Sequence, residues 1–168
     1  MNVLSLENIT KSFGERVLFE KISFDLSPGQ VLHVKGINGS GKSSLLQVIA
    51  GDLKATTGEV KINGKLALNG SELVKSIGYL PQELAIDFPI SVVDFIKMAR
   101  PDGDLIPILN QFNLNKLRDK KITELSLGQL QRVQIAQVVF QDPQIFLLDE
   151  PFSAQDQENV KLLISIFS

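Results

Sequence analysis

The stretch from Gly36 to Ser43 constrains the fold of this chain more than any other feature. It reads Gly-Ile-Asn-Gly-Ser-Gly-Lys-Ser and fits the pattern G-x-x-x-x-G-K-[ST], after an apolar segment at 31–35 and before a helical pattern at 42–50. Glycines let backbone N–H groups curl around phosphate oxygens, and a helix N-terminus adds a positive dipole end. The pattern predicts a strand, a phosphate-binding loop and a helix. The alternative is a glycine-rich turn that merely ends a strand.

A second segment, from Gln144 to Glu150, is an apolar strand that ends in two acids. Read alone, it is equally well a core strand followed by a solvated acidic turn. Together with the glycine-rich loop it indicates the metal side of a phosphoryl-transfer site. Asp149 would then hold the water shell of Mg²⁺, and Glu150 would polarise the attacking water.

Composition removes several other classes of protein. The 168 residues are 43% apolar and 21% charged, as in one soluble globular domain. The chain has no cysteine and one histidine, which excludes thiolate metal sites, disulfides and multi-histidine sites. A net charge of −2 argues against a basic nucleic-acid-binding module. No membrane span or signal peptide is evident, so a soluble intracellular α/β domain is expected, with His33 on a buried strand.

Periodicity and turn residues place the remaining elements. Residues 3–26 are expected to form strands, followed by a turn at 27–29, and Gly51 is expected to cap the helix that begins at Lys42. Asn63-Gly64 predicts a hairpin over 59–68. Further elements are expected as helices at 91–100, 104–112 and 128–141, a buried strand at 144–148 and a helical segment at 156–167.

Further motifs resemble those of the ATP-binding-cassette (ABC) ATPases, and the resemblance covers nearly the whole chain. Leu125-Ser126-Leu127-Gly128-Gln129 is similar to the signature motif of that family. Phe13 lies where the family places an aromatic residue that stacks on adenine, and Gln82 matches a glutamine that senses Mg²⁺ and the membrane partner. Residues 153–156 resemble the loop that crosses to a second subunit.

The resemblance implies a fold and a division of the chain. The expected fold is an α/β P-loop NTPase with a mainly parallel sheet, an N-terminal antiparallel β subdomain, a helical insertion and the last strands missing. Residues 1–168 would form a single ABC nucleotide-binding domain. Its catalytic core and β subdomain would take 1–82 and 142–168, and its helical subdomain 83–141.

ATP and Mg²⁺ are the implied cofactors, and the implied site residues fall into three groups. The catalytic residues would be Glu150, Lys42 and Gln82. The nucleotide contacts would come from Phe13, Gly36, Asn38, Gly39, Ser40, Gly41, Lys42, Ser43, Ser44, Ser126, Gly128 and Gln129. The Mg²⁺ contacts would come from Ser43, Gln82 and Asp149. Each of three residues also has a simpler interpretation: Phe13 as a core aromatic, Gln82 as a loop residue, and Ser126 as an ordinary helix N-cap.

The implied function is that of an ATP-hydrolysing subunit that powers an ABC transporter. Its partners would be permease subunits and a second ATP-binding subunit, as a homodimer, with no nucleic acid. It would be cytoplasmic and peripheral on the inner face of the cytoplasmic membrane. Residues 85–100 resemble the same region of zinc-, manganese- and iron-chelate importers. The alternative is that any ABC helical subdomain carries apolar residues there.

The chain departs from the family pattern at three places. Leu127 stands where the signature usually has glycine, and Gln155 replaces the usual leucine of the crossing loop. The chain ends at Ser168, before the position of the family's switch histidine, so we expect a C-terminally truncated and weakly active form. Two alternatives stay open: a hydrolysis-defective regulatory or vestigial ABC protein, and a non-transport ABC ATPase.

Overall fold

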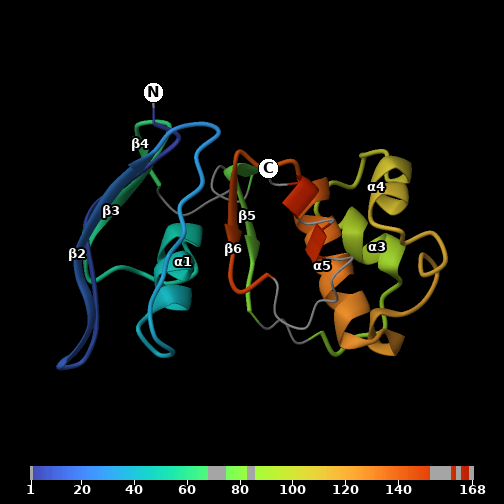
Figure 1. Ribbon diagram of the computed structural model, residues 1–168, viewed down its shortest axis with the longest axis horizontal. Helices are drawn as coiled ribbons and strands as arrows, with labels where there is room; N and C mark the ends of the chain where they lie inside the picture. The colour runs from blue at the N-terminus through green and yellow to red at the C-terminus, as the bar shows by residue number, and fades with distance from the viewer. Residues whose placement is uncertain (1, 68–74, 83–85, 152–159, 162–163, 167–168) are drawn as a thin grey trace. The chain divides into compact units, whose positions relative to one another are not determined.

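The computed structural model describes residues 2–67, 75–82, 86–151, 160–161 and 164–166, which form two compact units (Figure 1). The first unit contains Met1–Tyr79 and Gln144–Asp149, and the second contains Leu80–Pro143 and Glu150–Ser168. Within the described ranges, no helix has both the length and the apolar character needed to cross a membrane.

An antiparallel sheet forms one side of the first unit. The long strands β1 (Leu4–Phe13) and β2 (Arg16–Leu26) pair with each other, and β3 (Thr57–Ile62) and β4 (Lys65–Leu66) extend the sheet in the order β2-β1-β3-β4. Asn63 and Gly64 both have positive φ, at 50° and 76°, as a type I′ turn requires. The hairpin predicted around these two residues is therefore confirmed.

The first unit also holds helix α1 (Lys42–Ala50), the strand β6 (Ile145–Leu148) and all but the last residue of the strand β5 (Ile77–Leu80). The N–H of Gln144 donates to the carbonyl of Ser76 at 3.0 Å. Because these two residues directly precede the strands, β5 and β6 start at the same end and run parallel. Gly51 ends α1 with φ of 84°, which confirms the predicted glycine cap.

The core of the first unit lies between the antiparallel sheet, α1 and the parallel strands. On β1 the buried positions alternate at Leu4 and Leu6, and a register irregularity after Leu6 moves the next buried position to Ile9. The buried cluster consists of Leu4, Leu6, Ile9, Leu45, Val48, Ile49, Ile77, Ile145 and Leu147.

Residues 31–35 differ from the sequence-based expectation. In the described part of the chain they form no strand, and Val31 is 85% exposed. His33 is exposed as well, so its assignment to a buried strand was wrong. The apolar residues at 31, 32 and 34 are compatible with a strand, but a strand also needs a partner edge to satisfy its backbone groups. Neither described sheet includes this segment.

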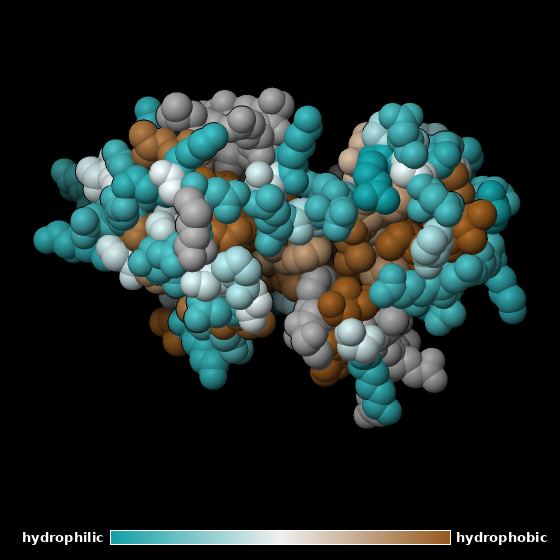
Figure 2. Space-filling view, turned by 90° about the horizontal axis from the view of Figure 1, so that it is seen from above, coloured by the Kyte–Doolittle hydropathy of each residue, from teal (hydrophilic) through white to brown (hydrophobic). Residues whose placement is uncertain are grey.

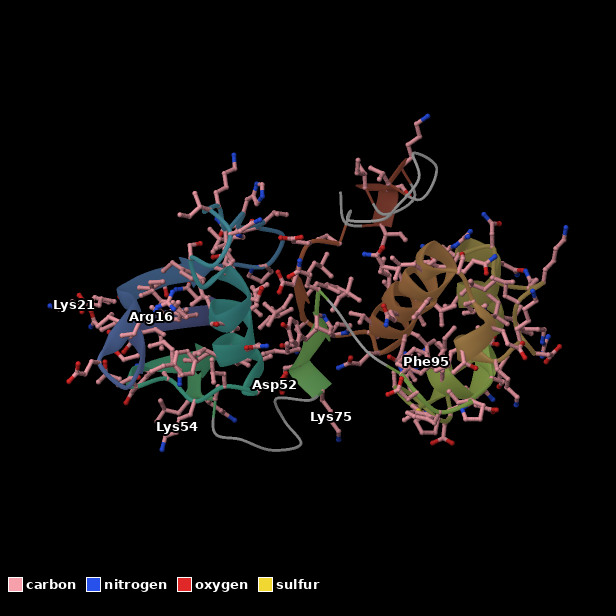
Figure 3. The ribbon with its side chains drawn as sticks, turned by 90° about the horizontal axis from the view of Figure 1, so that it is seen from below. Arg16, Lys21, Asp52, Lys54, Lys75 and Phe95 are labelled. Atoms are coloured by element: carbon pink, nitrogen blue, oxygen red, sulfur yellow. The ribbon has the colours of Figure 1, made fainter. Side chains whose placement is uncertain are left out.

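The second unit is helical. It contains α3 (Val92–Lys97), α4 (Ile106–Gln111), the short 3₁₀ helix η1 (Ile122–Glu124) and α5 (Leu127–Phe140). The amide of Gln137 on α5 donates to the backbone carbonyl of Phe95 on α3 at 2.6 Å, and Figure 3 labels Phe95 in this unit. Phe112, Leu114, Val133 and Ile135 are among its fully buried side chains.

The predicted helices at 91–100, 104–112 and 128–141 are confirmed as α3, α4 and α5, the first two being shorter than expected. Ser91 caps α3 by accepting the N–H of Asp94 at 3.1 Å, and Pro107 stands in the first turn of α4. The strand predicted at 144–148 is confirmed as β6. Most of the segment predicted at 156–167 lies outside the described residues, although 160–161 and 164–166 are helical.

Candidate nucleotide-binding site

The glycine-rich loop of the first unit leads directly into α1. Gly39 and Gly41 have φ of 77° and 96°, a region that favours glycine because it has no Cβ. A Cβ on Gly41 would lie 2.8 Å from Cγ of Leu18, so both the backbone conformation and the packing require glycine there. A Cβ on Gly36 would lie 2.5 Å from Oγ of Ser40. The loop is thus a tight cradle of backbone groups whose shape depends on glycine.

The ammonium of Lys42 lies within this loop. Its Nζ donates to the carbonyls of Gly36 at 3.0 Å and Ile37 at 3.1 Å. The first turn of α1 contains no acidic residue, so neither side chain nor dipole opposes an anion at this end of the helix. Ser43 and Ser44 occupy the same first turn, and Asn38 and Ser40 are exposed in the loop. The Lys42 ammonium and the N-terminus of α1 therefore both lie at the loop, which is the arrangement that phosphate binding requires.

Asp149, directly after β6, is a buried carboxylate with an unsatisfied oxygen. It is 5% exposed, and its Oδ2 has no hydrogen-bond partner among the described residues. A buried carboxylate oxygen without a partner is costly unless a cation or an ordered water satisfies it. Oxygen donors are also what Mg²⁺ prefers, so Asp149 and the Ser43 hydroxyl have the chemistry of a magnesium site.

The pKa of Tyr79 on β5 is sensitive to the negative charge of this carboxylate. Burial, together with the negative charges of Asp149 and Asp52, raises the pKa of Tyr79 to about 12 from an ordinary value of 10.0. The Tyr79 hydroxyl, like Oδ2 of Asp149, is buried without a hydrogen-bond partner among the described residues. Sequence reasoning missed Tyr79, because only the fold brings its phenol close to the acids.

Phe13 is an exposed aromatic rather than a core residue. It is 53% exposed at the end of β1, so the core-aromatic alternative is wrong. The ammonium of Lys11 lies 4.6 Å from the centroid of the Phe13 ring. Sequence reasoning missed this lysine too, although positions two apart on a strand share a face and give the signal that could have found it.

Two predicted catalytic residues meet in the second unit. The side-chain amide of Gln82 donates to Oε2 of Glu150 at 3.0 Å. Glu150 has a positive φ of 50°, uncommon for a residue with a Cβ, at the point where the chain leaves β6. The amide of Gln131 on α5 donates to the carbonyl of Pro151 at 3.4 Å. Glu150 is thus held by its strained backbone and by the Gln82 amide, and Gln131 fixes the next residue, Pro151.

The signature-like motif forms the N-terminus of α5. Oγ of Ser126 accepts the N–H of Gln129 at 3.3 Å, and Oε1 of Gln129 accepts the N–H of Ser126 at 3.2 Å. This capping box confirms the N-cap interpretation of Ser126. Leu127, the first residue of the helix, is 68% exposed. Residues 153–156 of the predicted crossing loop lie outside the described residues.

Each unit therefore carries part of the predicted site. The first unit contains the phosphate loop, Asp149 and the exposed ring of Phe13, and the second contains Gln82, Glu150 and the signature-like cap. A glycine cradle at a helix N-terminus, followed later by an apolar strand that ends in an acid, defines the P-loop nucleotide-binding class.

Comparison with known proteins identifies the family. The family model described as ABC transporter matches residues 19–153, and the chain belongs to this family. An uncharacterized ABC transporter ATP-binding protein of Methanocaldococcus jannaschii is 35% identical over 175 residues. That match covers 97% of this chain, which spans 62% of the relative's length.

Solved structures support the same conclusion. A putative metal-chelate type ABC transporter in an inward-facing conformation is 30% identical with a TM-score of 0.79, covering 98% of this chain and 66% of that one. A dimeric ATP-binding cassette in a post-hydrolysis state bound to ADP and Pi is 26% identical with a TM-score of 0.84, covering 97% of this chain and 80% of that one. The fold is that of ABC-type P-loop NTPase domains.

Proposed function

We propose that this chain is the ATP-binding and ATP-hydrolysing subunit of an ABC transporter, and that it works as a dimer on the cytoplasmic face of a membrane. The observation that carries the proposal is the position of the Lys42 ammonium, held by the Gly36 and Ile37 carbonyls inside a glycine loop. A lysine that donates hydrogen bonds to the carbonyls of its own loop can exchange these carbonyls for phosphate oxygens.

In this proposal the residues of the first unit bind the substrate. Backbone N–H groups from Gly36 to Ser44 contact the phosphates, and Phe13 stacks on the base. Ser43 and Asp149 would hold Mg²⁺, directly or through its waters, and Gln82 is proposed as a further contact. When bound, Mg²⁺ neutralises charge on the phosphates. Asp149 supplies the buried negative charge that matches this cation.

Glu150 is the proposed base or orienting group for the attacking water. Its carboxylate accepts a hydrogen bond from the Gln82 amide at 3.0 Å, which fixes the position of one oxygen. Gln82 is in this respect a positioning residue. Its contact with Glu150 also offers a route by which a membrane partner that moves Gln82 alters hydrolysis.

A second copy of the chain is proposed to complete the site. Ser126, Gly128 and Gln129 would act on the terminal phosphate bound by the other copy, because a helix N-terminus attracts anions. The similar cassette that is described as dimeric and bound to ADP and Pi supports this arrangement. The exposed Leu127 side chain lies in the same motif, where the family usually has glycine. Its bulk would crowd the nucleotide of the other copy, which supports weak ATP turnover. In the alternative function, the same crowding would allow nucleotide binding without hydrolysis.

The permease is proposed to dock on residues 83–101, of which 86–101 are described. Phe88 is 52% exposed and Met98 is 60% exposed, and hydrophobic side chains reach the surface elsewhere in the molecule as well (Figure 2). A contiguous exposed apolar surface is typical of a face that a partner covers. Similarity to a transporter described as putative metal-chelate type supports metal ions or metal chelates as the transported substrate class.

Titration with a fluorescent ATP analogue tests the proposal. Lys42→Ala should abolish binding, because it removes the only side-chain cation of the loop, while Lys65→Ala on the exposed strand β4 should bind like the wild type. A second titration at raised ionic strength distinguishes specific from nonspecific binding, because salt screens nonspecific electrostatic attraction of the nucleotide. Unchanged affinity in Lys42→Ala would refute the assignment of this loop.

A further inference from the structure

The Phe13 ring is covered on one face by a cation that is itself anchored. Nζ of Lys11 lies 4.6 Å from the ring centroid and donates a hydrogen bond to the carbonyl of Lys54 at 2.8 Å. A lysine ammonium at this distance over an aromatic face is attracted by the ring quadrupole. Because the ammonium is also fixed by a carbonyl, it holds the ring rather than sampling solvent.

The same hydrogen bond belongs to a short array at the end of β1. The N–H of Ser12 donates to Oγ1 of Thr56 at 2.9 Å, and the N–H of Thr56 donates to the carbonyl of Thr10 at 2.8 Å. Residues 54–56 follow α1, whose N-terminus carries the phosphate loop. The array therefore ties the strand that ends in Phe13 to the chain that leaves the phosphate-loop helix; Figure 3 labels Lys54 in this region.

We propose that Lys11 is a positioning residue for the nucleotide base: clamped between the Lys54 carbonyl and the Phe13 ring, its ammonium orients the ring so that a base stacks on the opposite face. This inference rests on the proposed nucleotide-binding function. A cation on one face blocks that face and draws electron density from the ring, which favours stacking of an electron-rich purine on the other. Phe13 keeps an exposed fraction of 53% for this contact.

The experiment compares affinities for MgATP and for magnesium tripolyphosphate, which has the phosphates but no base. Lys11→Met keeps the length of the side chain and removes its charge. We expect its affinity for MgATP to fall about two- to fivefold, the size of an exposed cation–π contact. Its affinity for tripolyphosphate should stay at the wild-type value, because the phosphate loop is untouched.

Three further variants serve as controls. Lys11→Arg preserves the cation over the ring and should restore wild-type affinity for MgATP. Lys21→Met removes a lysine from the neighbouring strand β2, labelled in Figure 3, and should leave both affinities unchanged. Phe13→Leu should weaken MgATP binding by at least about fivefold through loss of base stacking. In the Phe13→Leu background, Lys11→Met should have no further effect, because Lys11 acts through the ring.

Several outcomes would overturn the inference. A fall in tripolyphosphate affinity with Lys11→Met would mean direct phosphate contact, and a parallel fall in melting temperature and in both affinities would mean a merely structural role. Unchanged MgATP affinity in Lys11→Met, with Phe13→Leu still impaired, would also refute it while leaving the proposed function intact. Failure of the wild-type chain to bind MgATP would instead refute the proposed function.

Discussion

The pKa of Tyr79 reports the negative charge of Asp149 in the candidate site. Both have a buried oxygen without a hydrogen-bond partner among the described residues, and both belong to the unit that carries the phosphate loop. Burial first, and then the charges of Asp149 and Asp52, keep the phenol of Tyr79 protonated beyond its ordinary range. A cation at Asp149 would oppose this effect.

Tyr79 is the single tyrosine in a chain without tryptophan, so its ionisation can be followed by ultraviolet absorbance. We expect a midpoint near 12 in the folded chain and near 10.0 in denaturant. Asp149→Asn should lower the folded midpoint, and Lys65→Ala should not change it. A folded midpoint at the ordinary value would contradict the burial and the negative field described for this phenol.

The same shift has a consequence for stability. Below pH 10.0 the phenol is protonated in both the folded and the unfolded chain, so it adds no pH dependence there. Between pH 10.0 and about 12 the unfolded chain loses a proton that the folded chain keeps, so the free energy of unfolding falls as the pH rises. Tyr79→Phe should reduce this slope in denaturant unfolding measured across that window.

At the scale of elements, local patterns predicted most of the secondary structure, because each pattern reports an interaction within its own segment. Asn63-Gly64 predicted a turn through its positive φ angles, and Ser126 predicted a helix start through its capping hydroxyl. Residues 31–35 were wrongly predicted as a strand, because strand pairing depends on a partner edge elsewhere in the chain.

The local conformation of the candidate site was predictable for a similar reason. The phosphate loop can be recognised from its glycines, because the positive φ angles at Gly39 and Gly41 depend only on the local sequence. The hydrogen bond from Gln82 to Glu150 and the cation over Phe13 join residues in three dimensions, and no periodicity encodes such contacts. The register irregularity between Leu6 and Ile9 on β1 was likewise invisible in the alternation of apolar residues.

Gly58 is the position where the antiparallel sheet depends most on the absence of a side chain. It has φ of 91°, and a Cβ would lie 2.5 Å from the backbone carbonyl oxygens of Glu7 and Asn8. We expect Gly58→Ala to lower the free energy of unfolding by roughly 3 kcal/mol, the sum of backbone strain and a clash that backbone cannot relieve.

Gly29→Ala is the matched control, since Gly29 has φ of 79° with no heavy atom near its missing Cβ. It should show the backbone strain alone, about 1 kcal/mol. Urea unfolding of the two variants measures the difference. Equal stability of Gly58→Ala and Gly29→Ala would show that the close approach of β1 to β3 at this point is not present in solution.

At the scale of the whole molecule, we propose that hydrolysis needs two copies of the chain. The phosphate loop and Asp149 belong to one compact unit, and the capped N-terminus of α5 belongs to the other. In the proposed dimer the signature-like motif of one copy faces the nucleotide bound by the other. Neither copy alone then offers a complete set of contacts to the terminal phosphate.

The most direct test of hydrolysis by a dimer is phosphate release from MgATP measured over a wide range of chain concentrations. We expect slow turnover whose rate per chain rises with concentration, because only dimers hydrolyse ATP. Glu150→Gln should bind MgATP but release phosphate at least about a hundredfold more slowly, the contribution expected of a positioned general base. A rate per chain that is independent of concentration, or turnover unchanged in Glu150→Gln, would contradict this proposal.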